Sequence, residues 1–214
     1  MPTERTQLRR RATRGHYAPA DVHAVVDATL ICHVATVVGG EPRVLPTAVW
    51  RMDEEAIVHG AAANGLLGAL AAGAPFALCV TCVDGLVLAR SAFHHSVNYR
   101  SLVAFGTARR LDDVEEKRRA SEIFVEKVCA GRSKEARMPT DDELRATLFV
   151  ALPLDEASVK IREGGVNDDE ADLSWPCWAG VIPVSTTFGV PEAADGVTAA
   201  APLRRRRARA AAGR

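Results

Sequence analysis

The sequence has few of the features expected of a secreted, disulfide-stabilised or membrane-embedded protein. Its five cysteines are an odd number, which argues against a framework of paired disulfides. The apolar run at 66–80 is interrupted by glycine and proline and is too short to span a bilayer. Residues 1–15 are basic, but no apolar segment follows them as it would in a secretory signal. We therefore expect free thiols, no contact with a membrane and a location in the cytoplasm.

Net charge is also absent, because 27 basic side chains balance 27 acidic ones. The charges are unevenly distributed: residues 1–14 carry +4 and residues 204–214 carry +6, which leaves about −10 on the residues between them. The C-terminal segment has no apolar pattern and is expected to be disordered. Its arginines are compatible with nucleic-acid binding. We favour the alternative of a basic extension without such a partner.

The common catalytic and nucleotide-binding motifs are missing. No glycine-rich dinucleotide loop, P-loop, serine nucleophile elbow or H-E-x-x-H motif occurs. The acidic run at 167–172 lacks the glycine and the closing glutamate of a calcium-binding loop, so we expect a solvated loop and no metal site. Cys79 and Cys82 form a C-x-x-C inside an apolar strand pattern. Because side chains alternate between the faces of a strand, these two sulfurs are expected to point in opposite directions and to be structural.

Hydrophobic periodicity predicts at least six antiparallel strands before one long helix and two or three strands after it. Helices are expected at 19–29, at 64–72 with Asn64 as N-cap, over 112–131, and from Thr140, where Glu143 completes a capping box. The long helix is expected to bury apolar positions that include Val114, Ile123, Phe124 and Val128. The expected strands are 31–38, 42–50, 56–60, 76–83, 86–93, 99–111, 148–154, 157–163 and a short one within 174–184. A turn at Gly39 and Gly40 is expected to join the first two strands as a hairpin.

This order of elements predicts a mainly β protein of the α+β class, a β-barrel with peripheral helices, and argues against a doubly wound parallel sheet. We expect three regions along the chain. A disordered basic arm covers 1–14, the barrel domain covers 15–190, and a disordered tail rich in arginine and alanine covers 191–214.

The segment 84–106 is the most informative part of the sequence. It reads as two strands folded back on each other, with histidine, asparagine, tyrosine, arginine and serine residues at their junction. Such polar groups between apolar strands are costly unless they are hydrogen-bonded or face a ligand, so we interpret the segment as the wall of a cofactor site. Arg90, inside an apolar strand, requires an anionic partner, either a phosphate or a structural carboxylate.

Several motifs occur in a characteristic order. P-T-x-x-W lies at 46–50, V-H-G at 58–60, DGLVLARSAFHHS-x-NYRS at 84–101 and WAGVIPV at 178–184. With this order, residues 15–190 resemble the pyridoxamine 5′-phosphate oxidase-like flavin proteins, in the branch near the nitroimidazole reductases. The resemblance implies a split β-barrel that forms a homodimer, with FMN in clefts at the dimer interface.

The resemblance also implies a set of cofactor-binding residues. His59 lies near the flavin in such proteins, although a hydrogen-bonded core histidine is the alternative. Asn64 and Gly65 open a helix whose free N–H groups suit a phosphate, or they form an ordinary cap. Trp178 is expected to cover the flavin or to pack in the core or interface. The candidate cofactor-binding residues are Thr47, His59, Gly60, Asn64, Gly65, Arg90, Ser91, His94, Tyr99, Arg100, Ser101, Lys160 and Trp178.

The function implied is that of an oxidoreductase, in which FMN carries electrons from a nicotinamide donor to a small organic acceptor. One departure is the segment 59–65, HGAAANG, which has alanines and a glycine where relatives carry a serine and a basic residue. This weakens the expected phosphate site. The alternative is therefore a non-catalytic protein that binds flavin, deazaflavin or haem, with His59 or His94 as the axial ligand of a haem.

Overall fold

The computed structural model describes residues 2–197, which form two antiparallel sheets with helices around them. The larger sheet has the order β1-β10-β7-β6-β2-β3, with β11 also paired to β6, and the smaller has the order β4-β5-β9-β8. The prediction of a mainly β split barrel with peripheral helices is confirmed. The strands of the larger sheet are β1 (Gly15–His16), β2 (Ile31–Val38), β3 (Glu41–Ala48), β6 (Pro75–Leu88), β7 (Ser96–Thr107), β10 (Ala157–Arg162) and β11 (Gly180–Pro183). Those of the smaller sheet are β4 (Trp50–Met52), β5 (Glu55–Ala61), β8 (Arg109–Arg110) and β9 (Thr147–Pro153).

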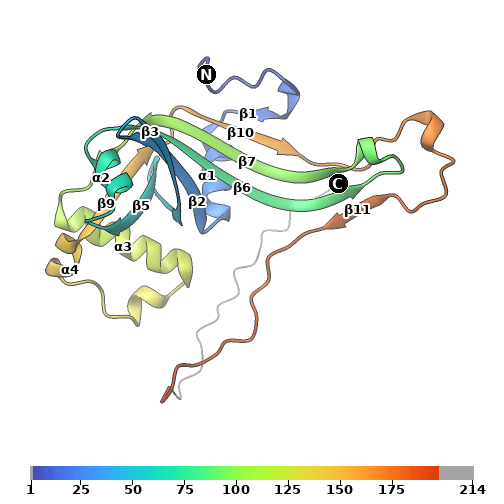
Figure 1. Ribbon diagram of the computed structural model, residues 1–214. Coiled ribbons are helices and arrows are strands. Elements are labelled where there is room, and N and C mark those ends of the chain that lie inside the picture. The colour runs from blue at the N-terminus through green and yellow to red at the C-terminus, as the bar shows by residue number, and fades with distance from the viewer. Residues whose placement is uncertain (1, 198–214) are drawn as a thin grey trace.

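The helices lie around the barrel (Figure 1). They are α1 (Pro19–Ala28), α2 (Gly65–Ala71), α3 (Val114–Val128) and α4 (Asp141–Ala146), with short 3₁₀ turns η1 (Ala12–Arg14), η2 (Ala92–His94), η3 (Arg132–Lys134) and η4 (Glu170–Asp172). No helix among the described residues is long and apolar enough to cross a membrane.

Local sequence signals explain where several elements begin and turn. Gly39 and Gly40 join β2 to β3 with φ values of +61° and +85°, the left-handed pair that a two-residue hairpin loop requires. The Asn64 side chain accepts hydrogen bonds from the N–H groups of Leu66 and Leu67 and so caps α2. Thr140 and Glu143 form the predicted capping box of α4. These three local predictions are confirmed.

The prediction of separate strands at 76–83 and 86–93 is wrong, because β6 runs without a break from Pro75 to Leu88. A bulge places Asp84 and Gly85 opposite Asn98, so the strand absorbs an extra residue and continues. A Cβ on Gly85 would lie 3.2 Å from the Val181 side chain and 3.3 Å from the Ile182 carbonyl oxygen. Glycine therefore permits β11 to pair with β6 at this point.

Beyond the barrel, β6 and β7 continue as an arm that ends in η2 and is joined by β11 (Figure 1). One face of the arm is covered: Val87 and Ala89 are buried there, and the Asn98 amide donates to the Gly164 carbonyl of the returning loop. The opposite face is exposed to solvent. On it, Ile182, Leu86 and Val97 lie directly across from one another on three strands, and all three are exposed.

Two apolar clusters fill the domain. One lies inside the barrel and includes Val22, Val25 and Val26 of α1. The other lies between the smaller sheet and the pair α3–α4 and is centred on Trp50. Together they place α3 and α4 on the outer face of the smaller sheet, where they help to enclose the cavity described below.

The predicted buried face of α3 is partly wrong. Val128 is half exposed at the end of the helix, whereas Lys117 and Lys127 are buried. The Lys127 ammonium donates to the carbonyl oxygens of Val26 and Val49, each at 2.9 Å. Its position is thus set by backbone acceptors on two other segments, which helical periodicity does not reveal.

The described N-terminal residues contact the end of the larger sheet. Thr6 is buried, and both Thr3 and Arg5 donate hydrogen bonds to the Glu156 carboxylate, just before β10. The division of the chain into a basic N-terminal segment at 1–14, a barrel domain at 15–190 and a tail at 191–214 stays a prediction. The arginines at 204–214 lie outside the described residues.

Candidate functional site

The predicted cofactor-binding residues fall into three groups, which lie in different parts of the folded chain. The first, at the tip of the arm, comprises Arg90, Ser91, His94 and Trp178. The second, on β7 and β10, comprises Tyr99, Arg100, Ser101 and Lys160. The third, on β5 and the start of α2 with one member on β3, comprises Thr47, His59, Gly60, Asn64 and Gly65. On β6, Cys82 lies directly opposite Arg100 of β7, and Arg90 follows Cys82 by eight residues, just past the end of β6. At the spacing of a strand, eight residues cover roughly 26 Å.

At the tip, the anionic partner of Arg90 is a carboxylate. The backbone N–H of Arg90 donates to Asp168 Oδ1 at 2.9 Å, and its Nη1 donates to Oδ2 at 2.7 Å. Burial alone would raise the pKa of Asp168, but the hydrogen bonds from Arg90 outweigh it and hold the pKa below its ordinary value. The sequence left a phosphate or a structural carboxylate as the partner of Arg90, and in the structure the partner is the carboxylate of Asp168.

In the second group, the side chains point to two different faces. Arg100 pairs with Asp84 through two hydrogen bonds, Nε to Oδ2 at 2.9 Å and Nη2 to Oδ1 at 2.7 Å. Strand alternation turns Tyr99 and Ser101 to the other face, together with Lys160, which lies directly opposite Ser101. The same face carries the exposed apolar row of the arm, which consists of Ile182, Leu86 and Val97.

In the third group, two residues have structural roles. The Asn64 carboxamide oxygen already accepts from two of the first N–H groups of α2. A Cβ on Gly60 would lie 2.7 Å from Leu67 Cδ1, so a larger residue would displace this buried side chain of α2. Of the alternatives for Asn64, the structure contains the cap.

His59 faces a cavity of about 360 Å³ between the smaller sheet and α3–α4, within the size range of small-molecule sites. Aromatic rings surround its imidazole: the ring centroid of Trp50 is 5.1 Å away, that of Phe124 5.2 Å and that of Phe149 5.7 Å. The cavity is lined by Trp50, His59, Ser121, Phe124, Val125, Arg137, Met138, Pro139, Glu143, Leu144, Thr147 and Phe149.

Two polar atoms on the cavity-lining residues lack hydrogen-bond partners among the described residues: Nδ1 of His59 and Nε1 of Trp50, both buried. Leaving such groups unpaired costs roughly 1–3 kcal/mol each, so they are expected to meet a ligand or ordered water. Burial also lowers the pKa of His59. The imidazole is therefore neutral at physiological pH and has a nitrogen lone pair with which to bind a metal centre.

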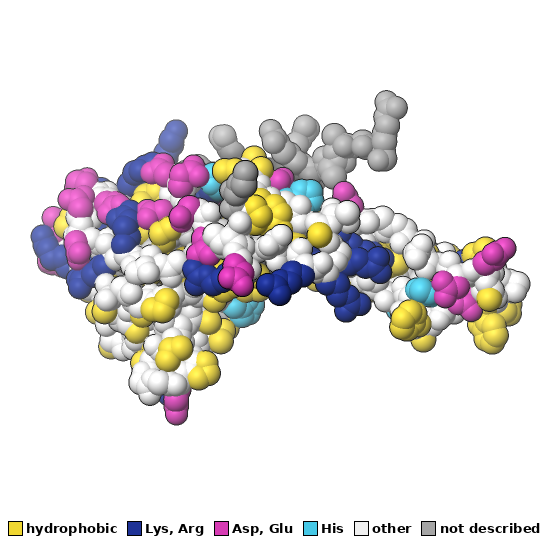
Figure 2. Space-filling view, turned by 90° about the horizontal axis from the view of Figure 1, so that it is seen from above, with side chains coloured by type: hydrophobic (Ala, Val, Ile, Leu, Met, Phe, Trp, Pro, Cys, Tyr) yellow, Lys and Arg dark blue, Asp and Glu magenta, His cyan; other side chains and the backbone are white. Residues whose placement is uncertain are grey.

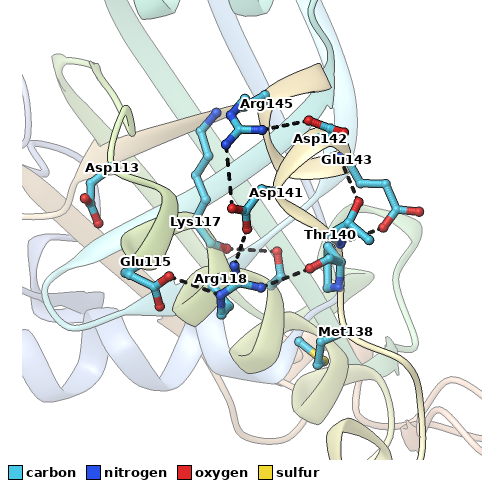
Figure 3. Close-up of polar contacts among 12 residues, drawn as sticks. Asp113, Glu115, Lys117, Arg118, Met138, Thr140, Asp141, Asp142, Glu143 and Arg145 are labelled. Atoms are coloured by element: carbon cyan, nitrogen blue, oxygen red, sulfur yellow. Dashed lines mark hydrogen bonds and ion pairs between the residues drawn. The ribbon is translucent and has the colours of Figure 1, made fainter.

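The outer wall of this cavity is fixed by polar contacts between α3 and α4 (Figure 3). Arg118 donates to the Pro139 carbonyl at 3.0 Å and to Asp141 at 2.6 Å. Lys117 donates to the carbonyl oxygens of Leu144 and Thr147, at 2.9 and 3.1 Å. These bonds hold the 137–139 segment and α4 in place before any ligand binds.

Sequence reasoning missed most of this cavity. Phe124 was identified only as an apolar helix position and Trp50 only as part of a motif, while Phe149 and Arg137 received no role. The signal available in the sequence was one aromatic residue on each of three elements: Trp50 on β4, Phe124 on α3 and Phe149 on β9. Their convergence on His59 depends on how α3 crosses the sheet.

His94, at the arm tip, is in a very different environment from His59. Its Nε2 lies 3.0 Å from Asp169 Oδ2, and this hydrogen bond, with the charges of Asp169, Asp168 and Asp172, raises the pKa of His94. The ion pair therefore stabilises the fold fully below pH 6.5, and its contribution is lost as pH rises through the folded-state pKa.

We expect NMR titration of His94 to give a midpoint above 6.5, the ordinary value. Asp169→Asn should lower this midpoint because it removes the hydrogen-bonded carboxylate. Asp195→Asn is the control and should leave the midpoint unchanged, because Asp195 is exposed and is not among the carboxylates that raise the pKa of His94. An unchanged midpoint in Asp169→Asn would show that the pair does not exist in solution.

Comparison with known proteins identifies the family. Residues 18–161 match the family model described as pyridoxamine 5′-phosphate oxidase. The chain belongs to this family. The membership predicted from the sequence motifs is confirmed, together with the split-barrel fold.

Two solved structures are similar to this chain over most of its length. The flavocytochrome Anf3 from Azotobacter vinelandii is 35% identical, with a TM-score of 0.86 over 94% of each chain. The FAD- and haem-binding protein from Mycobacterium smegmatis is 36% identical, with a TM-score of 0.82 over 89% of this chain and 93% of the other. No curated protein sequence matches significantly.

A third structure shares the fold at lower similarity. It is described as a 5-nitroimidazole antibiotic resistance protein from Bacteroides thetaiotaomicron, with 18% identity and a TM-score of 0.58 over 69% of this chain and 86% of the other. The cofactor-binding residues predicted for the present chain stay predictions. Of these candidates, His59 lines the cavity between the smaller sheet and α3–α4.

Proposed function

We propose that this protein is a redox protein that binds a flavin and a haem in a homodimer. The observation that carries the proposal is the similarity, at 35% and 36% identity over most of the chain, to a flavocytochrome and to an FAD- and haem-binding protein. This extends the prediction of an FMN oxidoreductase. It takes haem, first considered as an alternative to flavin, as a second cofactor, and it favours FAD over FMN and deazaflavin.

His59 is the better of the two predicted haem ligands. Its neutral imidazole lies among apolar rings, and its buried Nδ1 has no partner among the described residues. His94 lies at the tip of the arm, outside the aromatic cavity, and its Nε2 is hydrogen-bonded to Asp169. The residues present therefore fit a haem at His59.

Other residues of the cavity would hold the haem against the sheet. The rings of Trp50, Phe124 and Phe149 offer an apolar bed for a flat macrocycle. Arg137, on the same cavity, is ion-paired with Glu143 through two hydrogen bonds of 2.9 and 2.8 Å. Its guanidinium would provide a cation for a haem carboxylate.

We assign the flavin to the bare outer face of the larger sheet, at a homodimer interface. This face carries exposed Ile31, Val37, Val44 and Val83 on the barrel and continues into the apolar row of the arm. Exposed apolar surface of this kind marks interaction sites. Tyr99, Ser101 and Lys160 lie on the same face and would supply polar contacts to the cofactor.

A flavin paired with a haem supplies a route from a two-electron hydride donor to one-electron chemistry. The role of the chain is to hold the two groups, to keep His59 neutral and to exclude water from the aromatic cavity. The donor we propose is a nicotinamide and the acceptor a small molecule, in the cytoplasm.

The test is retention of both cofactors by the untagged protein. We would mix it with haemin and either FAD or FMN, desalt it, measure bound cofactor per chain and record its mass by light scattering. The proposal predicts a dimer that retains one haem and one flavin per chain, with FAD retained better than FMN. Anaerobic addition of NADH or NADPH should then bleach the flavin band and sharpen the haem bands. Loss of both cofactors on desalting would overturn the proposal.

A further inference from the structure

A cluster of potential metal ligands lies at the tip of the arm, away from the cavity at His59. His94 of η2 meets Asp169 and Asp172 of the η4 segment, although the two segments are 75 residues apart in sequence. One ligand atom from each residue lies within 4.8 Å of those of the other two. Figure 2 shows histidine, acidic and hydrophobic side chains together at the tip.

We propose that His94, Asp169 and Asp172 form a binding site for a divalent transition-metal ion, with Zn²⁺ as the probe. One imidazole and two carboxylates are ligand types that Zn²⁺ accepts, at about 2.0–2.2 Å. Atoms coordinated to one ion at those lengths in tetrahedral geometry are roughly 3.3–3.6 Å apart. The atoms of the cluster need only small side-chain movements to reach such an arrangement.

The carboxylates of this cluster are available to an ion. Asp169 is the N-cap residue of η4, yet its side chain makes no capping hydrogen bond. The Asp172 carboxylate has no hydrogen bond or ion pair among the described residues. Two carboxylates and a neutral imidazole also balance the charge of a divalent cation.

The neighbouring residues hold the cluster together. Asp168, next to Asp169, is almost fully buried and pairs with Arg90, which ties this loop to the end of β6. Arg90 is thus occupied by Asp168 rather than by the two proposed ligands. The Phe93 ring meets His94 edge-on at 5.1 Å between centroids. An ion here would cross-link the arm tip to the 163–179 loop. This departs from the expectation, from sequence alone, of a solvated loop without metal.

Calorimetric titration with Zn²⁺ tests the site, on untagged protein free of haem and flavin. We expect one ion per chain in the wild type, and binding at least about tenfold weaker in His94→Ala and in Asp172→Asn. The matched control is His95→Ala. This adjacent histidine bonds the Ser91 carbonyl through Nδ1 and should bind Zn²⁺ as the wild type does.

Titration with Co²⁺ separates this site from binding by any of the five cysteine thiols. The proposed nitrogen and oxygen ligands predict a cobalt spectrum without a thiolate charge-transfer band. Full-strength Zn²⁺ binding in His94→Ala, a thiolate band with Co²⁺, or no binding below millimolar Zn²⁺ would each overturn the proposal. The result is independent of haem or flavin binding, which are measured separately.

Discussion

Replacing His59 with alanine is expected to abolish the Soret band of the haemin-reconstituted protein while flavin retention stays as in the wild type. The proposed haem ligand is lost, but the flavin is assigned to the other sheet. The cavity keeps its aromatic rings, so haemin would bind there at most weakly and without a histidine ligand. The measurement is the absorption spectrum after desalting, with flavin and haem quantified separately.

Two further samples separate ligation from folding. Adding free imidazole to His59→Ala should restore the spectrum of histidine-ligated haem, because the vacated space admits the missing ligand. His94→Ala should bind haem as the wild type does, since that histidine is paired with Asp169 at the arm tip. A normal Soret band in His59→Ala, with loss in His94→Ala, would reverse the assignment.

Lys127→Met is expected to lower the free energy of unfolding by about 3 kcal/mol. The ammonium is buried and donates to the carbonyl oxygens of Val26 and Val49. Methionine keeps most of the apolar stem but has no donor, so both carbonyl groups lose the ammonium, at about 1–3 kcal/mol for each hydrogen bond. Among the described residues, the Val26 carbonyl oxygen keeps only the 3.4 Å hydrogen bond from the Thr29 N–H. These bonds tie α3 to the end of α1 and to the junction of β3 with β4.

Urea denaturation followed by circular dichroism measures this change, which should appear as a lower midpoint with an unchanged slope. Lys134→Met is the matched control, because Lys134 is exposed on η3 and its replacement should change stability by less than about 0.5 kcal/mol. A loss below about 1 kcal/mol in Lys127→Met would mean that water replaces the ammonium at both carbonyl groups.

Local structure could be predicted from the sequence where the cause is local. The glycine pair at 39–40, the Asn64 cap and the Thr140–Glu143 capping box each act within a few residues. The bulge at Asp84 could not be predicted in the same way. It depends on the register against Asn98 and on the approach of β11, a strand about one hundred residues later in the chain.

The same limit applies to charged residues. Arg90 was expected to need an anion, but its partner Asp168 is 78 residues away in an acidic run that reads as an ordinary loop. Lys127 follows the polar pattern of a helix surface, yet its ammonium binds backbone atoms of α1 and of the segment between β3 and β4. In each case the partner is determined by tertiary packing.

The candidate site depends both on motifs that the sequence shows and on contacts that tertiary packing determines. Sequence motifs identified the family and His59, and both the family and the barrel were correct. They did not show that Phe124 of α3 and Phe149 of β9 meet His59 beside a cavity. That arrangement requires α3 to cross the smaller sheet, which no local pattern predicts.

Binding of both flavin and haem is tested by the absorption spectrum of the protein as purified from cells supplied with a haem precursor, before and after reduction with dithionite. A dimer that binds flavin and haem should show a flavin band that bleaches and a Soret band that shifts on reduction, both from the same dimeric species. A colourless protein that also takes up neither added flavin nor added haemin would contradict it.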